Sequence, residues 1–394
     1  MRVEKTYYLF TILLALGMGM TVSSYGPFLR EIGLSLGQIA LVNAVFWLVL
    51  SVSEIPTGLV ADGRGRAWSL RLGTLFEVAG AFTYFFASGV WSAMLAEVLF
   101  GIGMAFLSGA QQAWLVDALR AEKRGEQVRH AFATAGILSG VGMLVGGGLG
   151  ALVSMWRPHF IWLPMVACGL AASWLAARHM EGWGNPETAM TEREAFRQAV
   201  RTLRSNSSLW WLTGTMLVFG LVIPFNNYWS VYFEEDAGRL GLAGVWTVIY
   251  LSVMAGSWLV RRVRFADHHE GTGALVALGT TAVGLLVLPA VGFPLSFAPL
   301  VLHELGRGAL QPLSDSFVQR RVESGCRATF GSLLSLIAKA GNVSAPLAAW
   351  WFTRGMGNSQ ATIAGVWITA GAIMLAFVFL LWVFRPREAY PISS

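Results

Sequence analysis

The sequence predicts an all-α membrane protein with twelve transmembrane helices in two pseudo-symmetric bundles of six. Three observations predict this class. The 394 residues are 55% hydrophobic and only 13% charged, and a soluble fold of this length could not bury so much apolar surface. Apolar runs of about 20 residues, the length of a bilayer-spanning helix, recur along the chain. A polar stretch near the middle divides these runs into two sets of six.

Each run is expected to be a helix, because lipid offers no partner for free backbone groups and the runs are too long and too uniform for barrel strands. The first run is longer than the apolar part of a signal peptide and lacks a clear cleavage site, so we expect it to be retained as a helix. In order, the predicted spans are residues 7–29, 38–60, 69–88, 92–118, 131–154, 159–178, 208–232, 241–260, 272–292, 296–318, 328–352 and 360–384.

Basic residues predict the orientation of these helices. Lys and Arg resist translocation and mark cytoplasmic loops. If the N-terminus is inside, most of the 28 Lys and Arg residues fall on the cytoplasmic side, so both termini are expected to be cytoplasmic. This topology accounts for the net charge of +6 without a nucleic-acid partner. We expect a multi-pass protein of a bacterial inner, or cytoplasmic, membrane.

The predicted domains follow from the central polar stretch. They are a first six-helix bundle over residues 1–178, a cytoplasmic linker over 179–207, and a second bundle with a short cytoplasmic tail over 208–394. Within the linker, "TEREAFRQAVRTLR" has an apolar side and a basic side. This pattern fits a helix lying on the anionic membrane surface, and it fits a solvated linker helix equally well.

The two halves show weak sequence symmetry. Glu97 lies four residues before Gly101 in the fourth span, and Glu304 lies four residues before Gly308 in the tenth. Parallel repeats of six helices place a substrate site between the halves, near the middle of the bilayer.

The stretch "EIPTGLVADGRGRAW" carries a resemblance to a known family. Gly58, Asp62, Gly65 and Arg66 match the loop between helices 2 and 3 of the major facilitator superfamily, written G-x-x-x-D-R/K-x-G-R-R/K. Together with "SGAQQAWLVD", the stretch is most similar to the drug/proton antiporter-like branch. The resemblance covers the whole chain, although Gly63 and Ala67 stand where basic residues are usual.

The resemblance implies the major facilitator fold and a gate at the cytoplasmic side formed by Gly58, Asp62, Gly65 and Arg66. Glycine at two of these positions permits close backbone approach, and Asp62 can pair with Arg66 or accept from a helix N-terminus. The alternative is that Asp62 only caps a helix and the arginines only fix topology.

Charges at membrane depth are the next signal, since each requires a partner, a wet cavity or neutralisation. A proton-coupled carrier needs a carboxyl group that gains and loses a proton, and Glu97 suits this task best. In many drug/proton antiporters the motif R-x-x-Q-G-x-G has an arginine where "EVLFGIG" has Glu97, so the charge is reversed. A structural hydrogen bond is the alternative. The proton-coupling candidates are Glu97, Glu54, Glu304 and Asp315.

Arg307, three residues after Glu304, can neutralise it and turn it into a fixed support. Lys339 has no acid at helical spacing in its own span, so its partner is expected to be Asp315, Glu304 or an anionic substrate. Glu54 shares a helix face with Asn43, and functional and structural roles remain open for it.

Polar and aromatic residues on several helices are expected to line the substrate cavity. The many Trp and Phe side chains fit an amphipathic or apolar substrate, although interfacial belts also use them. Glycines at four-residue spacing in "GVGMLVGGGLG" are explained by close helix packing. The cavity candidates are Tyr25, Asn43, Ser108, Gln111, Asn226, Asn227, Tyr228, Arg307, Gln311 and Lys339.

Motifs of enzymes and of nucleotide sites are not found in the sequence, so no catalytic, metal or cofactor site is expected. We expect a secondary transporter that works by alternating access and uses the proton gradient to export a small amphipathic or hydrophobic compound. The alternatives are a proton symporter or facilitator for a small polar or anionic metabolite, and a membrane receptor that does not transport. The expected partners are a small-molecule substrate, protons and the lipid bilayer, and the protein is expected to be a monomer.

Overall fold

The computed structural model describes residues 2–180, 201, 203, 207–262, 270–322 and 327–385. The chain divides into two compact units, unit 1 with Met1–Glu187 and Trp229–Thr247, and unit 2 with Thr188–Tyr228 and Val248–Ser394. Most of the predicted linker, including its helix, lies outside the described residues, so the predicted domain boundaries stay a prediction.

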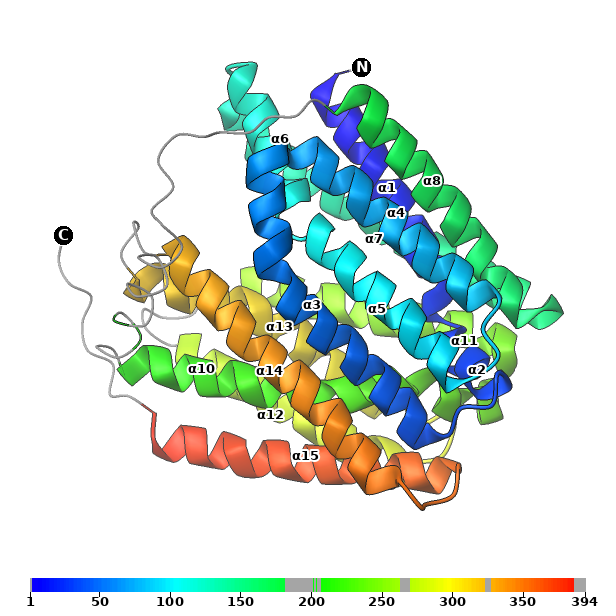
Figure 1. Ribbon diagram of the computed structural model, residues 1–394. Helices are drawn as coiled ribbons and strands as arrows, with labels where there is room; N and C mark the ends of the chain where they lie inside the picture. The colour runs from blue at the N-terminus through cyan, green and yellow to red at the C-terminus, as the bar shows by residue number, and fades with distance from the viewer. Residues whose placement is uncertain are drawn as a thin grey trace. The chain divides into compact units, whose positions relative to one another are not determined.

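Unit 1 is built from helices that pack as neighbours around α4 and α5. In Figure 1, α5 lies beside α3 and α4, and α4 lies beside α8. The helix α1 packs against α7 and α8. The elements are α1 (Val3–Val22), α2 (Tyr25–Glu31), α3 (Leu36–Arg64), α4 (Arg66–Phe85), α5 (Val90–Leu107), α6 (Ala110–Ala121), η1 (Gly125–Gln127), α7 (Val128–Trp156), η2 (Pro158–Ile161), α8 (Trp162–His179) and residues 229–247 of α11 (Ile223–Arg262).

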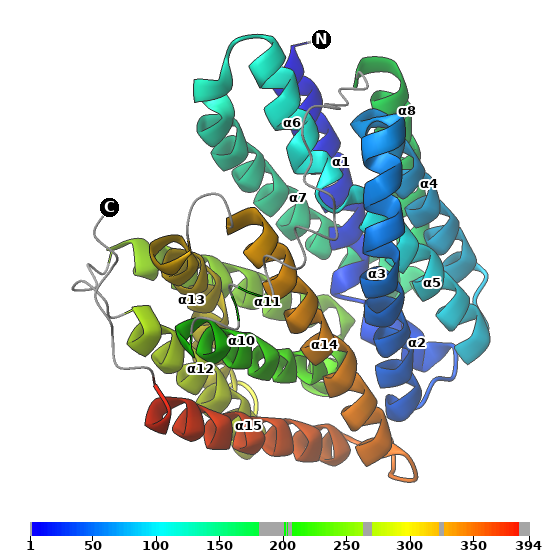
Figure 2. The same ribbon diagram turned by 60° about the vertical axis from the view of Figure 1, so that its left-hand side comes forward.

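Unit 2 is also helical, with α12 packed between α13 and α15. Figure 2 shows α12 beside α15, and α10 beside α14. No strand occurs in the described part of the chain. The elements are α10 (Ser207–Phe219), η3 (Gly220–Val222), the remainder of α11, α12 (Glu270–Val287), η4 (Leu288–Ala290), α13 (Phe297–Arg321), α14 (Arg327–Thr353) and α15 (Gln360–Val383).

Several predicted spans are interrupted in the structure. The first is divided into α1 and α2 at Ser23 and Ser24, and the seventh passes through the short 3₁₀ turn η3. The fourth is divided into α5 and α6 at Gly109, whose φ of 72° ends the regular helix. Glu97 on α5 and the predicted cavity residue Gln111 on α6 therefore do not share one straight helix face.

Eight segments of the described residues are long and apolar enough to cross a membrane by length and composition. One of them, Ser208–Arg262, covers two predicted spans. The predicted spans in α4, α13 and α14 do not meet the same measure of apolarity, although these helices have 20, 25 and 27 residues. Their membrane-depth charges, such as Glu77 in α4, Arg307 in α13 and Lys339 in α14, lower their hydropathy.

The glycines of α7 permit its close contact with α1, as the sequence predicts. A Cβ at Gly146 would meet the Leu16 carbonyl oxygen at 2.5 Å, and one at Gly150 would clash with the Met20 carbonyl oxygen. A side chain at either position would push the helices apart, so packing alone accounts for these glycines.

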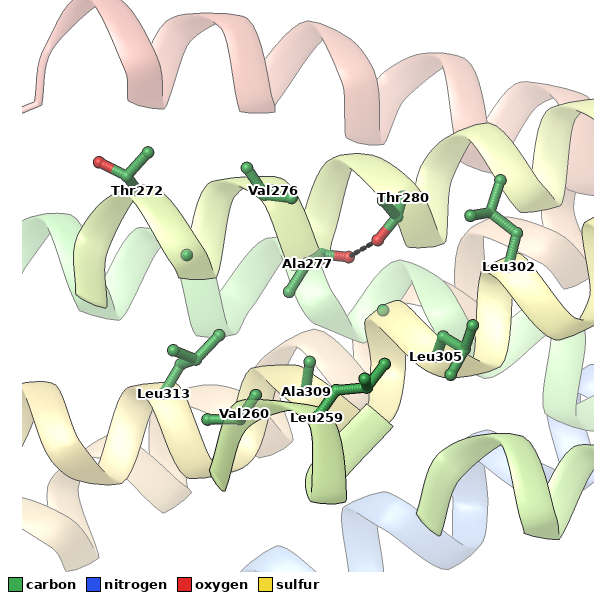
Figure 3. A pocket seen from close by; sticks show the side chains of 12 residues that line it. Leu259, Val260, Thr272, Val276, Ala277, Thr280, Leu302, Leu305, Ala309 and Leu313 are labelled. Carbon is green, nitrogen blue, oxygen red and sulfur yellow. Dashed lines mark hydrogen bonds between the residues drawn. The ribbon is translucent and has the colours of Figure 1, made fainter. Parts of the chain in front are cut away.

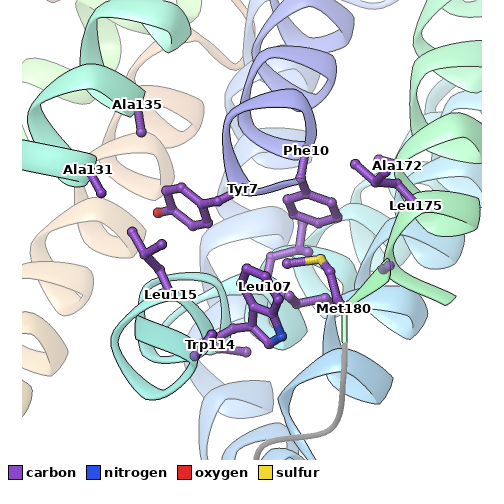
Figure 4. Close-up of a cluster of buried hydrophobic side chains, with 14 of the residues drawn as sticks. Tyr7, Phe10, Leu107, Trp114, Leu115, Ala131, Ala135, Ala172, Leu175 and Met180 are labelled. Atoms are coloured by element: carbon purple, nitrogen blue, oxygen red, sulfur yellow. The ribbon is translucent and has the colours of Figure 1, made fainter. Parts of the chain in front are cut away.

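The interior of unit 1 contains a cluster of buried apolar side chains from α1, α6, α7 and α8 (Figure 4). Phe10 and Trp114 at its centre are 0% and 1% exposed. Outward-facing positions are also apolar: Trp91 is 80% exposed and Trp156 is 81% exposed. A protein with apolar side chains both inside and outside is suited to lipid as its solvent.

Candidate functional site

The principal candidate site is the carboxyl group of Glu97 on α5, which is held by two tyrosine hydroxyls. Glu97 is only 7% exposed. Its Oε1 accepts hydrogen bonds from the hydroxyls of Tyr25 at 2.5 Å and Tyr84 at 2.6 Å. The two hydroxyl oxygens are themselves 2.8 Å apart. We call these three side chains the Glu97 site. They form a closed triangle of groups that can each exchange a proton.

Three helices position the Glu97 site. Tyr84 lies near the end of α4 and Glu97 near the start of α5, so the short connection between these helices brings both to the same end of unit 1. Tyr25 begins α2, just after the break that follows α1. The break is fixed to α7, because the Ser23 hydroxyl donates to the Gly147 carbonyl oxygen at 2.9 Å. The position of α7 therefore influences where Tyr25 meets Glu97.

Aromatic rings surround the Glu97 site. Trp162 at the start of α8 stacks on Tyr84 with ring centroids 4.3 Å apart, and Phe28 packs edge-on against both rings. Among the described residues, Glu97 makes no ion pair with a Lys, Arg or His side chain. Hydrogen bonds in such an apolar shell are stronger than in water, and hydroxyls rather than a fixed cation stabilise this carboxyl group.

The sequence analysis proposes Glu97 and Tyr25 for different tasks, and the structure brings them into contact. The sequence alone does not identify Tyr84 or Trp162 as part of this site, because their contacts come from separate helices and have no signature in sequence spacing. The proton-coupling role of Glu97 and the cavity role of Tyr25 stay predictions.

Unit 2 contains a second buried carboxyl group, that of Glu304 on α13, with partners of a different kind. Arg307 places its Nε 2.9 Å from Glu304 Oε2 and donates from Nη1 to Asn226 Oδ1 at 2.6 Å. The Glu304 side chain is 0% exposed, whereas that of Arg307 is 21% exposed. The close contact expected between Glu304 and Arg307 is therefore present, whereas the neutralisation of Glu304 stays a prediction. We call these three side chains the Glu304 site.

His303, which the sequence analysis does not single out, lies next to the Glu304 site. Its Nδ1 is 2.8 Å from the Thr281 carbonyl oxygen and its ring packs against Phe225. The hydrogen bond to Thr281 joins α13 to α12, so this histidine supports the helix that carries Glu304 and Arg307.

The other candidates of unit 2 divide into exposed and buried residues. On α13, the Gln311 amide donates to Asp315 Oδ1 at 2.9 Å, and both residues are exposed. Lys339 is half-buried on α14. Asn227 and Tyr228, by contrast, are 5% and 0% exposed. The structure covers these last two with protein, so a substrate could reach them only after a rearrangement.

In unit 1, the predicted cavity residues form small separate contacts. The Ser108 hydroxyl donates to Glu54 Oε1 at 3.4 Å, and the Gln111 amide donates to the Thr11 hydroxyl at 3.0 Å. Asn43 has a buried Oδ1 with no hydrogen-bond partner within the described part of the chain.

A cavity of about 350 Å³ in unit 1 is lined on one side by polar groups. Thr11, Gln112 and Ser139 supply these groups, and Tyr7 and Phe132 add aromatic faces. Gln112, rather than the predicted Gln111, lines this cavity. The mixture of a few polar groups with aromatic rings is typical of small-molecule pockets.

The predicted gate motif forms a very short connection. Gly65 alone separates α3 from α4, and its φ of 94° favours glycine over any other residue. Arg66 places its Nε 3.9 Å from Asp117 Oδ2 on α6. Asp117 closes the "SGAQQAWLVD" stretch, which was the available signal for this pair.

Two further expectations for the gate motif concern Gly58 and Asp62. A Cβ on Gly58 would meet no described atom within 4 Å, and the expected close backbone approach at this glycine stays a prediction. The side chain of Asp62 lies outside the described residues, and its expected pairing therefore stays a prediction.

Two further arginine clusters of unit 1 are not anticipated by the sequence. Arg239 lies 2.7 Å from a Glu31 carboxyl oxygen and 3.0 Å from one of Glu234. Arg124 pairs with Glu122 at 2.8 Å and with Glu4. Hydrogen bonds to Glu122 and then to Glu4 raise the pKa of Arg124, so this guanidinium stays charged. In the described residues, no three His, Cys, Asp or Glu side chains are grouped closely enough to hold a metal ion.

Comparison with known proteins identifies the family. The family model described as Major Facilitator Superfamily matches residues 7–346, most of the chain. The chain belongs to the Major Facilitator Superfamily. The chain therefore has the family and the fold of membrane transporters. One relative is an uncharacterized MFS-type transporter of Methanocaldococcus jannaschii, 22% identical over 162 residues. That match covers 40% of this chain and spans 42% of the length of the relative.

Solved structures of this superfamily fold resemble the whole chain. The nucleoside transporter NupG superposes with a TM-score of 0.83 at 11% identity, covering 98% of this chain and 100% of NupG. A POT family peptide transporter gives a TM-score of 0.75 at 12% identity, with 99% and 98% coverage. The human organic anion transporter MFSD10 gives 0.65 at 16% identity, with 96% and 99% coverage. At these identities the likeness establishes the fold alone.

Proposed function

We propose that this superfamily member is a proton-coupled secondary transporter in which Glu97 carries the proton. The observation that supports this proposal is the burial of the Glu97 carboxyl group between two tyrosine hydroxyls. In this proposal the coupling group must be stable both as a carboxylate and as a neutral acid. The two tyrosine hydroxyls can hydrogen-bond to Glu97 in either form.

The chemistry follows from what a tyrosine hydroxyl can do. When Glu97 is ionised, both hydroxyls donate to Oε1, as in the structure. When Glu97 is protonated, its new O–H needs an acceptor, and a tyrosine oxygen can accept while its own proton turns toward the other tyrosine. Proton gain and loss thus rearrange hydrogen bonds without leaving a buried charge unpartnered.

Protonation of Glu97 can change the position of the short helix α2. Tyr25 begins the short helix α2, which is connected to α1 by the break at Ser23 and Ser24. A changed hydrogen bond between Tyr25 and Glu97 alters the free-energy difference between positions of α2 relative to α4 and α5. Movement of α2 would then couple the charge state of Glu97 to the opening of a substrate path.

The first candidate substrate is a small amphipathic or hydrophobic compound, exported in exchange for protons. The similarity of "EIPTGLVAD" and "SGAQQAWLVD" to drug/proton antiporters and the aromatic faces of the 350 Å³ cavity support it. Within this proposal, Gly65 and the Arg66–Asp117 pair form part of the cytoplasmic gate.

A second candidate is symport or facilitated passage of a polar or anionic metabolite. Arg307 supports this alternative, because its guanidinium is partly exposed while Glu304 and Asn226 hold it in place. Transporters with this fold include the nucleoside and organic anion transporters named above. A receptor that binds without transport is the third alternative, and a test of translocation separates it from the others.

We further propose a monomer in a bacterial cytoplasmic membrane, with the proton gradient as its energy source and no bound cofactor. Length and composition support the membrane location, and the buried Glu97 supports the energy source.

The test begins with a growth screen. A host that lacks its own efflux pumps and expresses the protein is exposed to a panel of amphipathic toxins, and nucleosides and organic anions are offered in a parallel uptake screen. Protection or uptake identifies the probe. Purified protein in vesicles loaded with a pH dye then reports the proton flux that this probe drives, and the sign of that flux separates export from symport.

Glu97→Gln is expected to abolish the substrate-driven proton flux. Glu77→Gln is the matched control, because Glu77 is another buried acid of unit 1, also 7% exposed, on α4. Equal flux in wild type and Glu97→Gln would exclude Glu97 as the coupling residue. Tight binding of a probe that never crosses the membrane would support the receptor instead.

A further inference from the structure

A groove on unit 2 lies apart from both carboxyl sites. It has a volume of about 480 Å³ and runs between α12 and α13, with the end of α11 closing one side (Figure 3). Buried small residues form its floor, among them Gly273, Ala277 and Gly306. Exposed larger residues form its rims, among them Leu259 and Val276. Small residues below and large ones beside them leave a hollow apolar surface.

The protein cannot place a larger side chain at Gly306 in the floor of the groove. A Cβ on Gly306 would clash with the Ala277 carbonyl oxygen and the Thr280 hydroxyl, so α12 and α13 touch at their backbones here. The Thr280 hydroxyl bonds to the Ala277 carbonyl of its own helix at 2.9 Å and offers the groove little polarity (Figure 3). An apolar occupant from the bilayer is therefore favoured over water.

The length of the groove matches one leaflet of the bilayer. The lining residues of α13 extend from Leu302 to Leu313, a helical rise of about 17 Å. Half of a hydrocarbon core of about 30 Å is about 15 Å. An acyl chain that starts at one end of the groove can therefore lie along it to the middle of the membrane.

One end of the groove carries exposed arginines. Arg385, which follows α15, donates from Nη1 to the hydroxyl of Thr272 at 2.6 Å, and Thr272 lines the groove. Arg262 ends α11 directly after the lining residues Leu259 and Val260, and its guanidinium lies 5.1 Å from the Trp258 ring centroid. Both arginines are exposed. The acid at the start of α12, Glu270, is only 3% exposed.

We propose that this groove binds one anionic phospholipid. The phosphodiester lies between Arg262 and Arg385 beside the Thr272 hydroxyl, and one acyl chain lies over Gly306 between α12 and α13. Guanidinium groups bind phosphate oxygens with two parallel hydrogen bonds, and basic residues beside transmembrane helices select anionic lipids. This site does not depend on the substrate or on the direction of transport.

The test uses a photoactivatable phosphatidylglycerol with a diazirine in its acyl chain. The full-length protein is placed in phosphatidylcholine nanodiscs that contain this probe, and labelled peptides are mapped by mass spectrometry. Label is expected on α12 and α13 at the groove, including Val276 and Leu305. A phosphatidylcholine probe with the same diazirine should label these positions several times less.

Substitutions distinguish the two parts of the site. Arg262→Gln is expected to lower the groove label about fivefold, and the double change with Arg385→Gln up to about 30-fold. Arg354→Gln is the matched control, because Arg354 is also exposed and stacked on tryptophan at the end of α14. Val276→Trp, at a position already 60% exposed, should fill the groove and remove the label from α13.

Four results would overturn the proposal. One is equal labelling by the two phospholipid probes, which would indicate ordinary lipid contact. Another is an even spread of label over the outward-facing helices. The third is a groove label that survives both the double arginine change and Val276→Trp. Displacement of the label by the transported compound would also overturn it, because the groove would then belong to the substrate path.

Discussion

Glu97 and Glu304 occupy matching places in the two halves of the sequence, each four residues before a glycine, but they have opposite kinds of partner. Glu97 receives hydrogen bonds from two neutral tyrosine hydroxyls. Glu304 pairs with the guanidinium of Arg307. A neighbouring permanent cation favours the charged form of a carboxyl group, whereas hydroxyls can hydrogen-bond to both its charged and its neutral form. Partners, rather than position in the repeat, thus decide which acid is suited to carry a proton.

Proton-driven transport should distinguish the two acids most strongly. Glu97→Gln is expected to lower it to the level of protein-free vesicles, because an amide cannot carry the proton, while exchange of substrate without net proton movement continues. Glu304→Gln should instead lower driven transport and exchange together, because it weakens a support. Vesicle transport assays with and without a pH gradient measure both. Loss of driven transport alone in Glu304→Gln would reverse the assignment of roles.

For the free energy of unfolding, we expect the larger effect at the Glu304 site rather than at the Glu97 site. Arg307→Met is expected to cost about 3–5 kcal/mol, because it leaves the fully buried Glu304 carboxylate without its cation. Adding Glu304→Gln to this variant should recover much of the loss, since no buried charge then remains. Thermal unfolding of the purified variants in detergent provides the measurement. Additive losses in the double variant would mean that the pair does not act as a unit.

The two tyrosines of the Glu97 site provide a smaller and more detailed test. Tyr25→Phe and Tyr84→Phe each remove one hydrogen bond to a charged group, which corresponds to about a tenfold loss of proton-driven transport. The double variant should lose less than the sum of the two free energies, because the hydroxyls share Oε1 and contact each other. Tyr8→Phe, on α1, is the control. Fully additive losses would count against a shared site.

The least effect is expected at the Arg66–Asp117 pair. Its side chains are 25% and 26% exposed, and Arg66 Nε lies 3.9 Å from Asp117 Oδ2. Asp117→Asn should therefore change the free energy of unfolding by only about 0–1 kcal/mol. The same unfolding assay compares it directly with Arg307→Met. A loss as large as that of the buried pair would show that exposure does not explain the difference between them.

The class of fold can be predicted from the sequence, because each membrane-spanning helix needs a long apolar run, and such runs are visible in the composition along the chain. Repeated apolar runs predict the helices, and the glycines of α7 predict close helix packing, for which the structure gives α1 as the partner. The break within the fourth predicted span is harder to locate, since Gly109 takes a positive φ value but many glycines of the chain do not. Local sequence does not state which glycine turns the backbone.

The candidate site is only partly predictable for a related reason. Glu304 and Arg307 are three residues apart on one helix, so helical geometry predicts their contact. Tyr25, Tyr84 and Glu97 come from three helices and are 59 and 13 residues apart in sequence. Only the packing of α2, α4 and α5 joins them, and one sequence contains no spacing rule for such a contact.

The most direct measurement of the central claim is infrared difference spectroscopy of the protein in lipid, recorded as the pH is changed across the range in which transport occurs. The carbonyl stretch of a protonated carboxylic acid reports proton uptake by a buried acid without any substrate. We expect such a band in the wild-type protein and in Glu77→Gln, with loss of its main component in Glu97→Gln and only a frequency shift in Tyr84→Phe. A band that is unchanged in Glu97→Gln and lost in Glu304→Gln would contradict it.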